Sequence, residues 1–319
     1  MSGPAIVRSS CPALIVLLAS STLPGQSVPT KANFRSNTQM VLIPVTVTDR
    51  NARTVMGLHA EDFSVFDNGT PQPIRSFTSE DTPSSVALVL DVSGSMRDSL
   101  TTAKSAAQAF FQTANQYDEF LLLTVSTEPQ ALSNFTTDIA DIQEKIGYTK
   151  PAGMTALIDT VYLGMNRMRK ANQPRRAILV VSDGIDNYSR YSESELLRVA
   201  LEADVQIYTI VVPTTSGGVS TAAPYVPRMA AKPWDQARDR QGPSMLEKLS
   251  EKTGGLCLRV RRGNEATEAA TKVGQALRNQ YVIGYQPPEN DNSGRWHRVK
   301  VKSRLPKVNI YARTGYYAE

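Results

Sequence analysis

The chain has 319 residues, of which 41% are hydrophobic and 20% charged, and its 35 basic and 30 acidic side chains give a formal net charge of +5. This is the composition of a globular protein, and it excludes a largely disordered, collagen-like or fibrous repeat protein. The mild basic excess is interleaved with acidic residues and lacks aromatic enrichment, so no nucleic-acid partner is expected.

The first 27 residues are typical of a secretory signal peptide. Arg8 precedes a short apolar stretch at residues 13–19, and small residues follow it. A transmembrane helix needs roughly 20 apolar residues, so this stretch is too short to span a membrane. We therefore expect residues 1–27 to direct export to the periplasm, the cell surface or the medium, and the mature chain to have no transmembrane segment.

Removal of residues 1–27 would also remove Cys11 and leave Cys257 as the only cysteine. A lone cysteine forms no internal disulfide, so the exported chain would be stable through its core alone. Cys257 lies in the apolar run GLCLRV, which favours a buried small hydrophobic side chain over a nucleophile. With His59 and His297 as the only histidines, a zinc site is not expected.

Both flanks of the mature chain have antiparallel β character. Strands are predicted at residues 40–48, 61–67, 70–78, 281–285, 295–303 and 307–313. Asn68-Gly69, between the second and third of these, is a strong signal for a type I′ hairpin turn. Because the N-terminal flank is too small to hold a core alone, we expect residues 28–83 and 281–319 to meet in one small β domain.

Residues 84–280 have a different pattern, in which apolar runs of strand length alternate with helices. Strands are predicted at residues 86–91, 120–126, 131–136, 177–183, 205–212 and 255–260, and helices at 99–114, 138–146, 157–170, 192–203, 243–252 and 264–279. Continuously apolar strands are buried on both faces. The pattern therefore predicts an α/β domain, inserted into the β domain, with a parallel sheet between helices.

A tract rich in Pro, Gly, Ser, Thr and Ala occupies residues 213–243. About thirty residues is long for a loop inside a compact domain. Because the tract follows a predicted parallel strand, it should emerge at the carboxyl edge of the sheet. It is either a specificity element for a ligand bound there or a linker without a contact role.

Five side chains with oxygen donors occur at strand ends or just before helices. Asp91, Ser93 and Ser95 follow the first parallel strand, Thr155 precedes a helix, and Asp183 ends another buried strand. Ligands of open α/β sheets bind at the carboxyl ends of the strands. Two carboxylates and three hydroxyls are hard ligands that suit Mg²⁺, Mn²⁺ or Ca²⁺ but do not complete an all-protein shell. The sequence predicts a divalent metal with a position open to a ligand oxygen.

These five residues make the chain resemble von Willebrand factor type A domains that carry a metal-ion-dependent adhesion site. The motif of that site is D-x-S-x-S followed by a Thr and an Asp, which the five residues match in type, order and approximate spacing. The whole chain is also similar to bacterial exported proteins described as VWFA-related. In these a DF-x-V-x-DNG segment, here residues 62–69, precedes the A domain, and a Y-x-x-GY segment, here residues 281–285, follows it.

The resemblance covers roughly residues 84–280 and implies a doubly wound sheet like that of Rossmann folds. It also implies a bound divalent metal and recognition of a ligand without catalysis. An Asp or Glu carboxylate of a partner protein would complete the metal shell. The resemblance therefore predicts a non-enzymatic adhesion or protein-binding module.

Other functions fit the residues less well. A Mg²⁺-dependent phosphotransfer enzyme could use Asp91, but such enzymes typically place a second Asp two residues further on, where this chain has Ser93. A serine hydrolase would need His59 or His297 as its base, and both fall in predicted β segments. A third alternative is a scaffold subunit of a larger exported assembly.

Several residues near the motif have structural interpretations. Asp98 or Ser99 is expected to cap the following helix rather than to form a second metal site, and Asp186 to be a turn residue. Met154 and Met165, near Thr155, are expected in the core.

The basic segment at residues 295–307 alternates in a way that favours a half-buried strand over a polyanion site. Valines point one way and basic residues the other, namely Val299 and Val301 against Arg298, Lys300 and Lys302.

Overall fold

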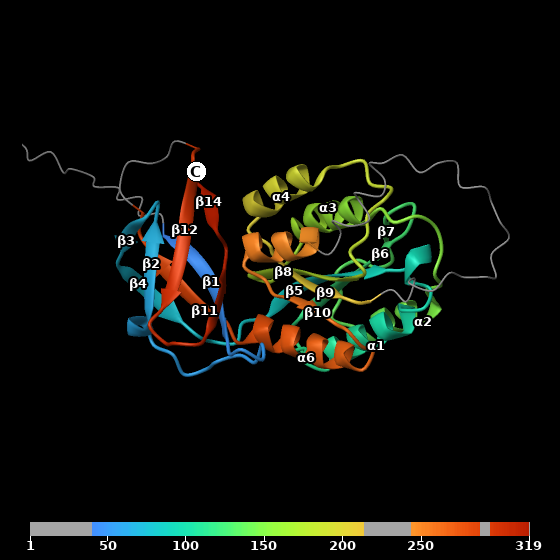
Figure 1. The fold of residues 1–319 in the computed structure, drawn as a ribbon, viewed down its shortest axis with the longest axis horizontal. Helices are drawn as coiled ribbons and strands as arrows, with labels where there is room; N and C mark the ends of the chain where they lie inside the picture. The colour runs from blue at the N-terminus through green and yellow to red at the C-terminus, as the bar shows by residue number, and fades with distance from the viewer. Residues whose placement is uncertain (1–39, 214–243, 288–293, 319) are drawn as a thin grey trace, which may run out of the picture. The chain divides into compact units, whose positions relative to one another are not determined.

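The computed structural model describes residues 40–213, 244–287 and 294–318. The predicted signal peptide and residues 214–243 of the Pro- and Gly-rich tract lie outside these residues. The described residues form one six-stranded sheet and two four-stranded sheets (Figure 1). Among the helices described, none is long and apolar enough to cross a membrane.

The six-stranded sheet has the strand order β10-β9-β8-β5-β6-β7. Its strands are β5 (Ser84–Asp91), β6 (Glu119–Val125), β7 (Gln130–Ala131), β8 (Arg175–Ser182), β9 (Gln206–Val211) and β10 (Cys257–Arg259). Neighbouring strands run parallel except β6 and β7, which are antiparallel. The predicted strand at residues 131–136 is therefore wrong for most of its length, because after β7 only Thr136 returns to bridge Phe120.

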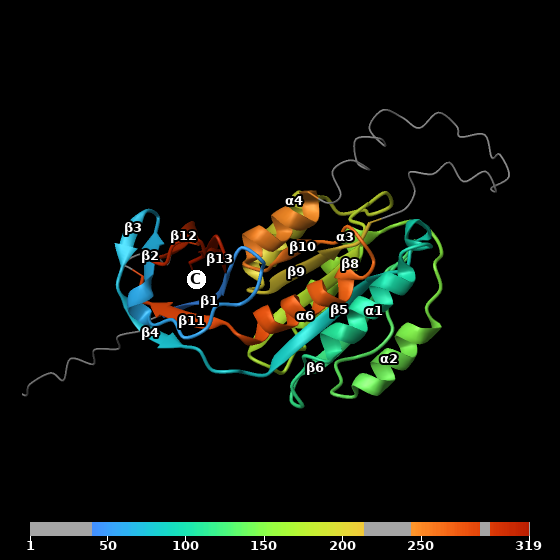
Figure 2. The same cartoon turned by 60° about the horizontal axis from the view of Figure 1, so that its bottom comes forward.

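Helices cover both faces of this sheet, which confirms the doubly wound α/β fold (Figure 2). The helices are α1 (Leu100–Phe111), α2 (Ile139–Tyr148), α3 (Leu157–Met168), α4 (Glu193–Glu202), a helix at residues 244–253 and α6 (Glu265–Arg278). On β5, Leu88 faces the core formed with α1, α2 and α6, and Val89 faces the core formed with α3 and α4. Burial on two faces explains why the strand is apolar at consecutive positions.

Cys257, on the edge strand β10, is partly buried against the core on the α3 and α4 side. Burial raises the pKa of its thiol above the usual value. A thiol held in the protonated form is a poor nucleophile, in agreement with the structural role expected for this residue.

The two flanks of the chain form antiparallel sheets with the orders β13-β1-β11-β4 and β14-β12-β2-β3. The strands are β1 (Val41–Thr48), β2 (Phe63–Asp67), β3 (Thr70–Gln72), β4 (Ile74–Thr78), β11 (Tyr281–Tyr285), β12 (Trp296–Ser303), β13 (Asn309–Ala312) and β14 (Gly315–Tyr317). Because β1 pairs with β11 and β13, and β2 with β12, each sheet combines both flanks, as expected. The single strand predicted at 70–78 is two strands separated by Pro73, of which β3 pairs with β2 in one sheet and β4 with β11 in the other. The sequence did not predict β14.

Asn68 and Gly69 have φ values of 49° and 84°, which confirms the type I′ turn predicted between β2 and β3.

The two sequence segments that flank the α/β part are in direct contact through a buried carboxylate. Just before this turn, the buried Asp67 carboxylate accepts a hydrogen bond from the Tyr285 hydroxyl at 2.8 Å and lies 2.9 Å from Nδ1 of His297. This buried polar contact connects β2, β11 and β12.

The predicted alternation of β12 is confirmed. Val299 and Val301 are buried in the core of the β sheets, whereas Arg298, Lys300 and Lys302 are exposed.

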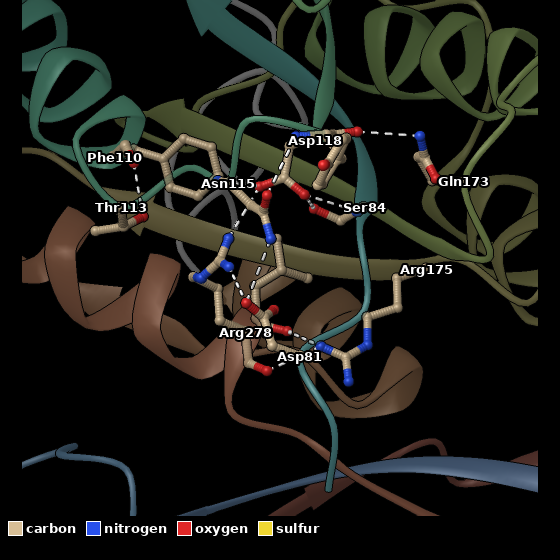
Figure 3. Close-up of polar contacts among 11 residues, drawn as sticks. Asp81, Ser84, Phe110, Thr113, Asn115, Asp118, Gln173, Arg175 and Arg278 are labelled. Atoms are coloured by element: carbon tan, nitrogen blue, oxygen red, sulfur yellow. Dashed lines mark hydrogen bonds and ion pairs between the residues drawn. The ribbon is translucent and has the colours of Figure 1, made fainter.

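The chain enters the α/β part just before β5 and leaves it just after α6. Polar contacts join these two segments at the amino edge of the sheet, where the parallel strands begin (Figure 3). The Asp118 carboxylate accepts hydrogen bonds from the Ser84 backbone at 2.7 Å and from Arg278 at 3.1 Å. Arg278 also pairs with Asp81, and Arg175 donates to the Arg278 carbonyl at 2.8 Å. The amino edge is thus structural, and the opposite, carboxyl edge is the place to look for a ligand site.

We predict that a polypeptide of residues 84–280 folds cooperatively, whereas residues 28–83 alone do not. The α/β part contains its own cores, but β1 and β2 lack their partner strands β11 and β12 without the C-terminal flank. Thermal melts followed by circular dichroism test both fragments. A cooperative melt of the isolated N-terminal fragment would contradict the shared β domain.

Candidate metal centre

Two of the predicted ligands lie where the direction of chain winding changes in the six-stranded sheet. Asp91 ends β5, and Asp183 follows the last residue of β8. The two strands are parallel neighbours, with Leu90 opposite Val181. From β5 the chain continues to β6 on one side, and from β8 it continues to β9 on the other. Such a switch point opens a crevice at the carboxyl edge, and ligands of this fold class bind there.

The loop after β5 brings the first three predicted residues together. Asp91 is fully buried, and its Oδ1 accepts a hydrogen bond from the Ser93 backbone N–H at 2.9 Å. Ser95 lies in a short 3₁₀ turn, and its Oγ is 3.0 Å from the Oγ of Ser93. A carboxylate and two hydroxyls are therefore clustered within five consecutive residues.

The segment that carries Thr155 is hydrogen-bonded to this loop. The Ala152 N–H donates to the Val92 carbonyl at 2.8 Å, and the Gly94 N–H donates to the Gly153 carbonyl at 2.9 Å. Gly153 has a φ of +80°, and a Cβ at this position would lie 2.5 Å from Oγ1 of Thr127. Only glycine allows this approach. Thr155 follows two residues later and is 2% exposed.

The end of β8 is connected to Asp91 through Ser182. The Ser182 hydroxyl donates to Oδ2 of Asp91 at 2.5 Å and accepts from the Gly184 N–H at 2.9 Å. The next residue, Asp183, is 5% exposed, and its Oδ1 accepts from the Ile185 N–H at 2.9 Å. Asp183 is thereby held in a tight turn at the switch point.

A second set of hydrogen bonds fixes Thr155 against the loop after β8. The Thr155 N–H donates to the side-chain oxygen of Asn187 at 2.9 Å, and the Thr155 carbonyl accepts from the N–H groups of Asn187 and Tyr188, both at 3.1 Å. Asp186 accepts from the Ile158 N–H, in the first turn of α3, at 2.9 Å. It also accepts from Ser189, three residues later, as expected of a turn residue.

The electrostatics of this edge favour a cation. Burial, with a further contribution from the charge of Asp183, raises the pKa of Asp91 to about 6, although hydrogen bonds from Ser182 and Ser93 act in the opposite direction. A buried carboxylate near a second one is destabilised in its charged form, and a nearby positive charge relieves this cost. The donor set, two carboxylates and three hydroxyls, is chemically suited to Mg²⁺.

The candidate centre differs from a His- or Cys-based metal site. Within residues 40–213, 244–287 and 294–318, no three or more His, Cys, Asp and Glu side chains form a group that could hold a metal ion. A cation at this edge would therefore depend on hydroxyl groups as well as on the two carboxylates.

The expectation for Met154 is wrong, and the expected capping of α1 is contradicted for Ser99. Met165 is buried as predicted, but Met154 is 47% exposed, because it lies in the loop before α3 rather than in the helix. Ser99 occupies the N-cap position of α1 without capping it, and its hydroxyl donates to the Pro213 carbonyl instead.

Sequence reasoning missed Ser182 and Asn187 as residues that position the site. The sequence gives a weak indication for Ser182, because it is a polar residue at the end of an apolar strand and precedes Asp183. It gives no indication for Asn187, because the role of that residue depends on the contact between two loops that are distant in sequence.

Comparisons with known proteins bear on the fold of this part of the chain. Residues 86–185 match the sequence model of the von Willebrand factor type A domain. Among solved structures, a von Willebrand factor type A protein from Catenulispora acidiphila is 13% identical, with a TM-score of 0.51, and the match covers 90% of this chain and 65% of that one. A search of curated proteins finds no match.

Two other similar structures cover less of this chain. The conserved hypothetical protein BatB from Bacteroides thetaiotaomicron is 19% identical, with a TM-score of 0.44, and the match covers 60% of this chain and 98% of that one. The von Willebrand factor domain of the type V pilus tip protein Mfa5 from Porphyromonas gingivalis is 14% identical, with a TM-score of 0.47 and coverages of 63% and 96%.

The winding of the sheet defines the α/β part as a doubly wound domain with a potential ligand site at its switch point. Residues 86–185, which match the von Willebrand factor type A model, lie within this domain and include the ends of β5 and β8.

We predict that Asp186→Ala lowers the free energy of unfolding by about 2 kcal/mol, because it leaves the Ile158 N–H and Ser189 without their buried partner. Chemical denaturation measures the change. Asp138→Ala is the control, since Asp138 caps α2 at an exposed position and should cost only about 0.5–1 kcal/mol. Equal losses in the two variants would contradict the role given to Asp186.

Proposed function

We propose that this protein is a non-enzymatic, divalent-metal-dependent protein-binding module. The metal would be Mg²⁺, or else Mn²⁺ or Ca²⁺, held by Asp91, Ser93, Ser95, Thr155 and Asp183. A partner protein would supply an Asp or Glu carboxylate. The observation that carries the proposal is the meeting of the loops bearing these residues at the switch point between β5 and β8.

Each residue has a distinct part in this proposal. The hydroxyl oxygens of Ser93, Ser95 and Thr155 would donate lone pairs, and the two aspartates would supply negative charge. Each Asp91 oxygen already accepts one hydrogen bond, and a carboxylate oxygen has room for a second partner. The bound metal would add a Lewis-acidic position that a ligand carboxylate can fill.

The residues of the motif favour binding over phosphotransfer at Asp91. Phosphotransfer enzymes with an aspartate nucleophile typically place a second Asp two residues further on as the general acid. The position two residues on is Ser93, which is a poor general acid at neutral pH. A scaffold role within a larger assembly is compatible with the same binding site.

We extend the proposal to export and to specificity. The charge and apolar pattern of residues 1–27 supports export. The tract that begins at residue 213 is a candidate specificity element, since the Pro213 carbonyl accepts a hydrogen bond from Ser99, four residues after Ser95.

We predict that Asp91→Ala weakens Mg²⁺ binding by at least about tenfold while the thermal melt stays cooperative. Isothermal titration calorimetry with MgCl₂ measures the affinity. Asp138→Ala serves as the control, because Asp138 is the exposed N-cap of α2 and is not among the proposed ligands, so that this variant should retain binding. A folded Asp91→Ala protein with unchanged affinity would refute the site.

An assay with p-nitrophenyl phosphate, a generic phosphatase substrate, distinguishes the binding module from a phosphotransfer enzyme. We expect no Mg²⁺-dependent turnover of this substrate. Turnover that disappears in Asp91→Ala would instead favour the phosphotransfer enzyme.

A further inference from the structure

Two large apolar side chains are exposed beside Thr155, a buried residue of the candidate centre. Met154 directly precedes Thr155 and is 47% exposed. Tyr188 is 53% exposed, and its backbone N–H donates to the Thr155 carbonyl at 3.1 Å. Isolated exposed apolar residues are common on protein surfaces. Here two of them, from different loops, flank the same buried threonine.

Hydrogen bonds to the scaffold hold both residues in place. The Met154 N–H donates to Oγ1 of Thr127 at 2.9 Å, in the loop after β6. Next to Tyr188, the Asn187 side chain accepts from the Thr155 N–H at 2.9 Å. The backbone around both side chains is thus fixed, and their exposure follows from the folded loops.

Two exposed arginines lie on the loops that carry the candidate centre. Arg190, two residues after Tyr188, has a side chain that is 88% exposed, although its Nε lies 3.6 Å from Oδ2 of Asp159. Arg97, two residues after Ser95, is exposed as well, and the exposed Asp98 offsets part of its charge. Such exposed cations around a binding site attract carboxylates during encounter.

We propose that Met154 and Tyr188 form an apolar rim that selects the residue next to the partner's carboxylate. The partner segment would carry an Asp or Glu directly beside a large apolar residue such as Leu, Ile, Met, Phe, Tyr or Trp. This inference rests on the proposed function, because the rim acts only on a ligand whose carboxylate is bound at the candidate centre. Burial of the rim would also exclude water from the carboxylate and strengthen its electrostatic attraction to the site.

A selection from displayed random peptides tests the inference with the full chain. Peptides are bound in the presence of Mg²⁺ and released with EDTA, and the released pool is sequenced. We expect Asp or Glu adjacent to a large apolar residue to be enriched. One enriched peptide, synthesised and titrated in solution, then gives affinities for the variants.

The rim variant is Met154→Ser/Tyr188→Ser, in which both changed side chains are exposed, so that the fold should be kept. We expect it to retain its Mg²⁺ affinity and its preference for an acidic residue, to lose the preference for the apolar neighbour, and to bind the selected peptide about tenfold more weakly. The matched control, Met56→Ser/Tyr117→Ser, removes a Met and a Tyr that are 50% and 60% exposed elsewhere. It should behave like the unchanged protein.

The outcomes separate the two proposals. Enrichment of acidic residues without an apolar neighbour, or equal peptide affinities of the rim variant and the control, would overturn the rim while leaving the metal-dependent module in place. A pool that EDTA does not release, or that Asp91→Ala selects equally well, would overturn the proposed function and the rim with it.

Discussion

The parallel pairing of β5 with β8 is the constraint on which the functional interpretation depends. Their register places the end of one strand beside the end of the other, so that Asp91 and Asp183 arrive at the same edge although they are far apart in sequence. The hydrogen bond from Ser182 to Asp91 spans the two strand ends directly. The remaining predicted ligands are carried by loops hydrogen-bonded to this pair of strands. The site is therefore a consequence of sheet topology.

This arrangement has an energetic cost, which itself points to a function. Two carboxylates near one another at a buried strand end disfavour the charged state, and the hydrogen bonds from Ser182 and Ser93 reduce that cost without removing it. A divalent cation would reduce the cost further, and the hydroxyls of Ser93 and Ser95 would add ligand oxygens that need no deprotonation. The same edge also exposes Met154 and Tyr188, so that charge and apolar surface are available to one ligand.

Much of the fold could be predicted from the sequence because each element depends on local pattern. The apolar run before Asp91 predicts a strand buried on both faces, and Asn68-Gly69 predicts its turn from backbone preferences alone. The site residues could be named because each follows a strand or precedes a helix. Properties set by loop–loop contacts could not be predicted. Met154 was expected in the core because it adjoins an amphipathic helix, but the chain has not yet entered the helix at that position. The hydroxyl of Ser99 likewise bonds Pro213, a partner over a hundred residues away.

The central claim is that these dispersed oxygens form one incomplete cation site. Crystals of the full chain grown with MnCl₂, with data collected at the manganese absorption edge, test it most directly. The account predicts one anomalous peak within about 2.5 Å of the hydroxyl oxygens of both Ser93 and Ser95, with a coordination position facing solvent or a neighbouring carboxylate. A map without a peak at saturating manganese, or with its peak remote from the ends of β5 and β8, would contradict it.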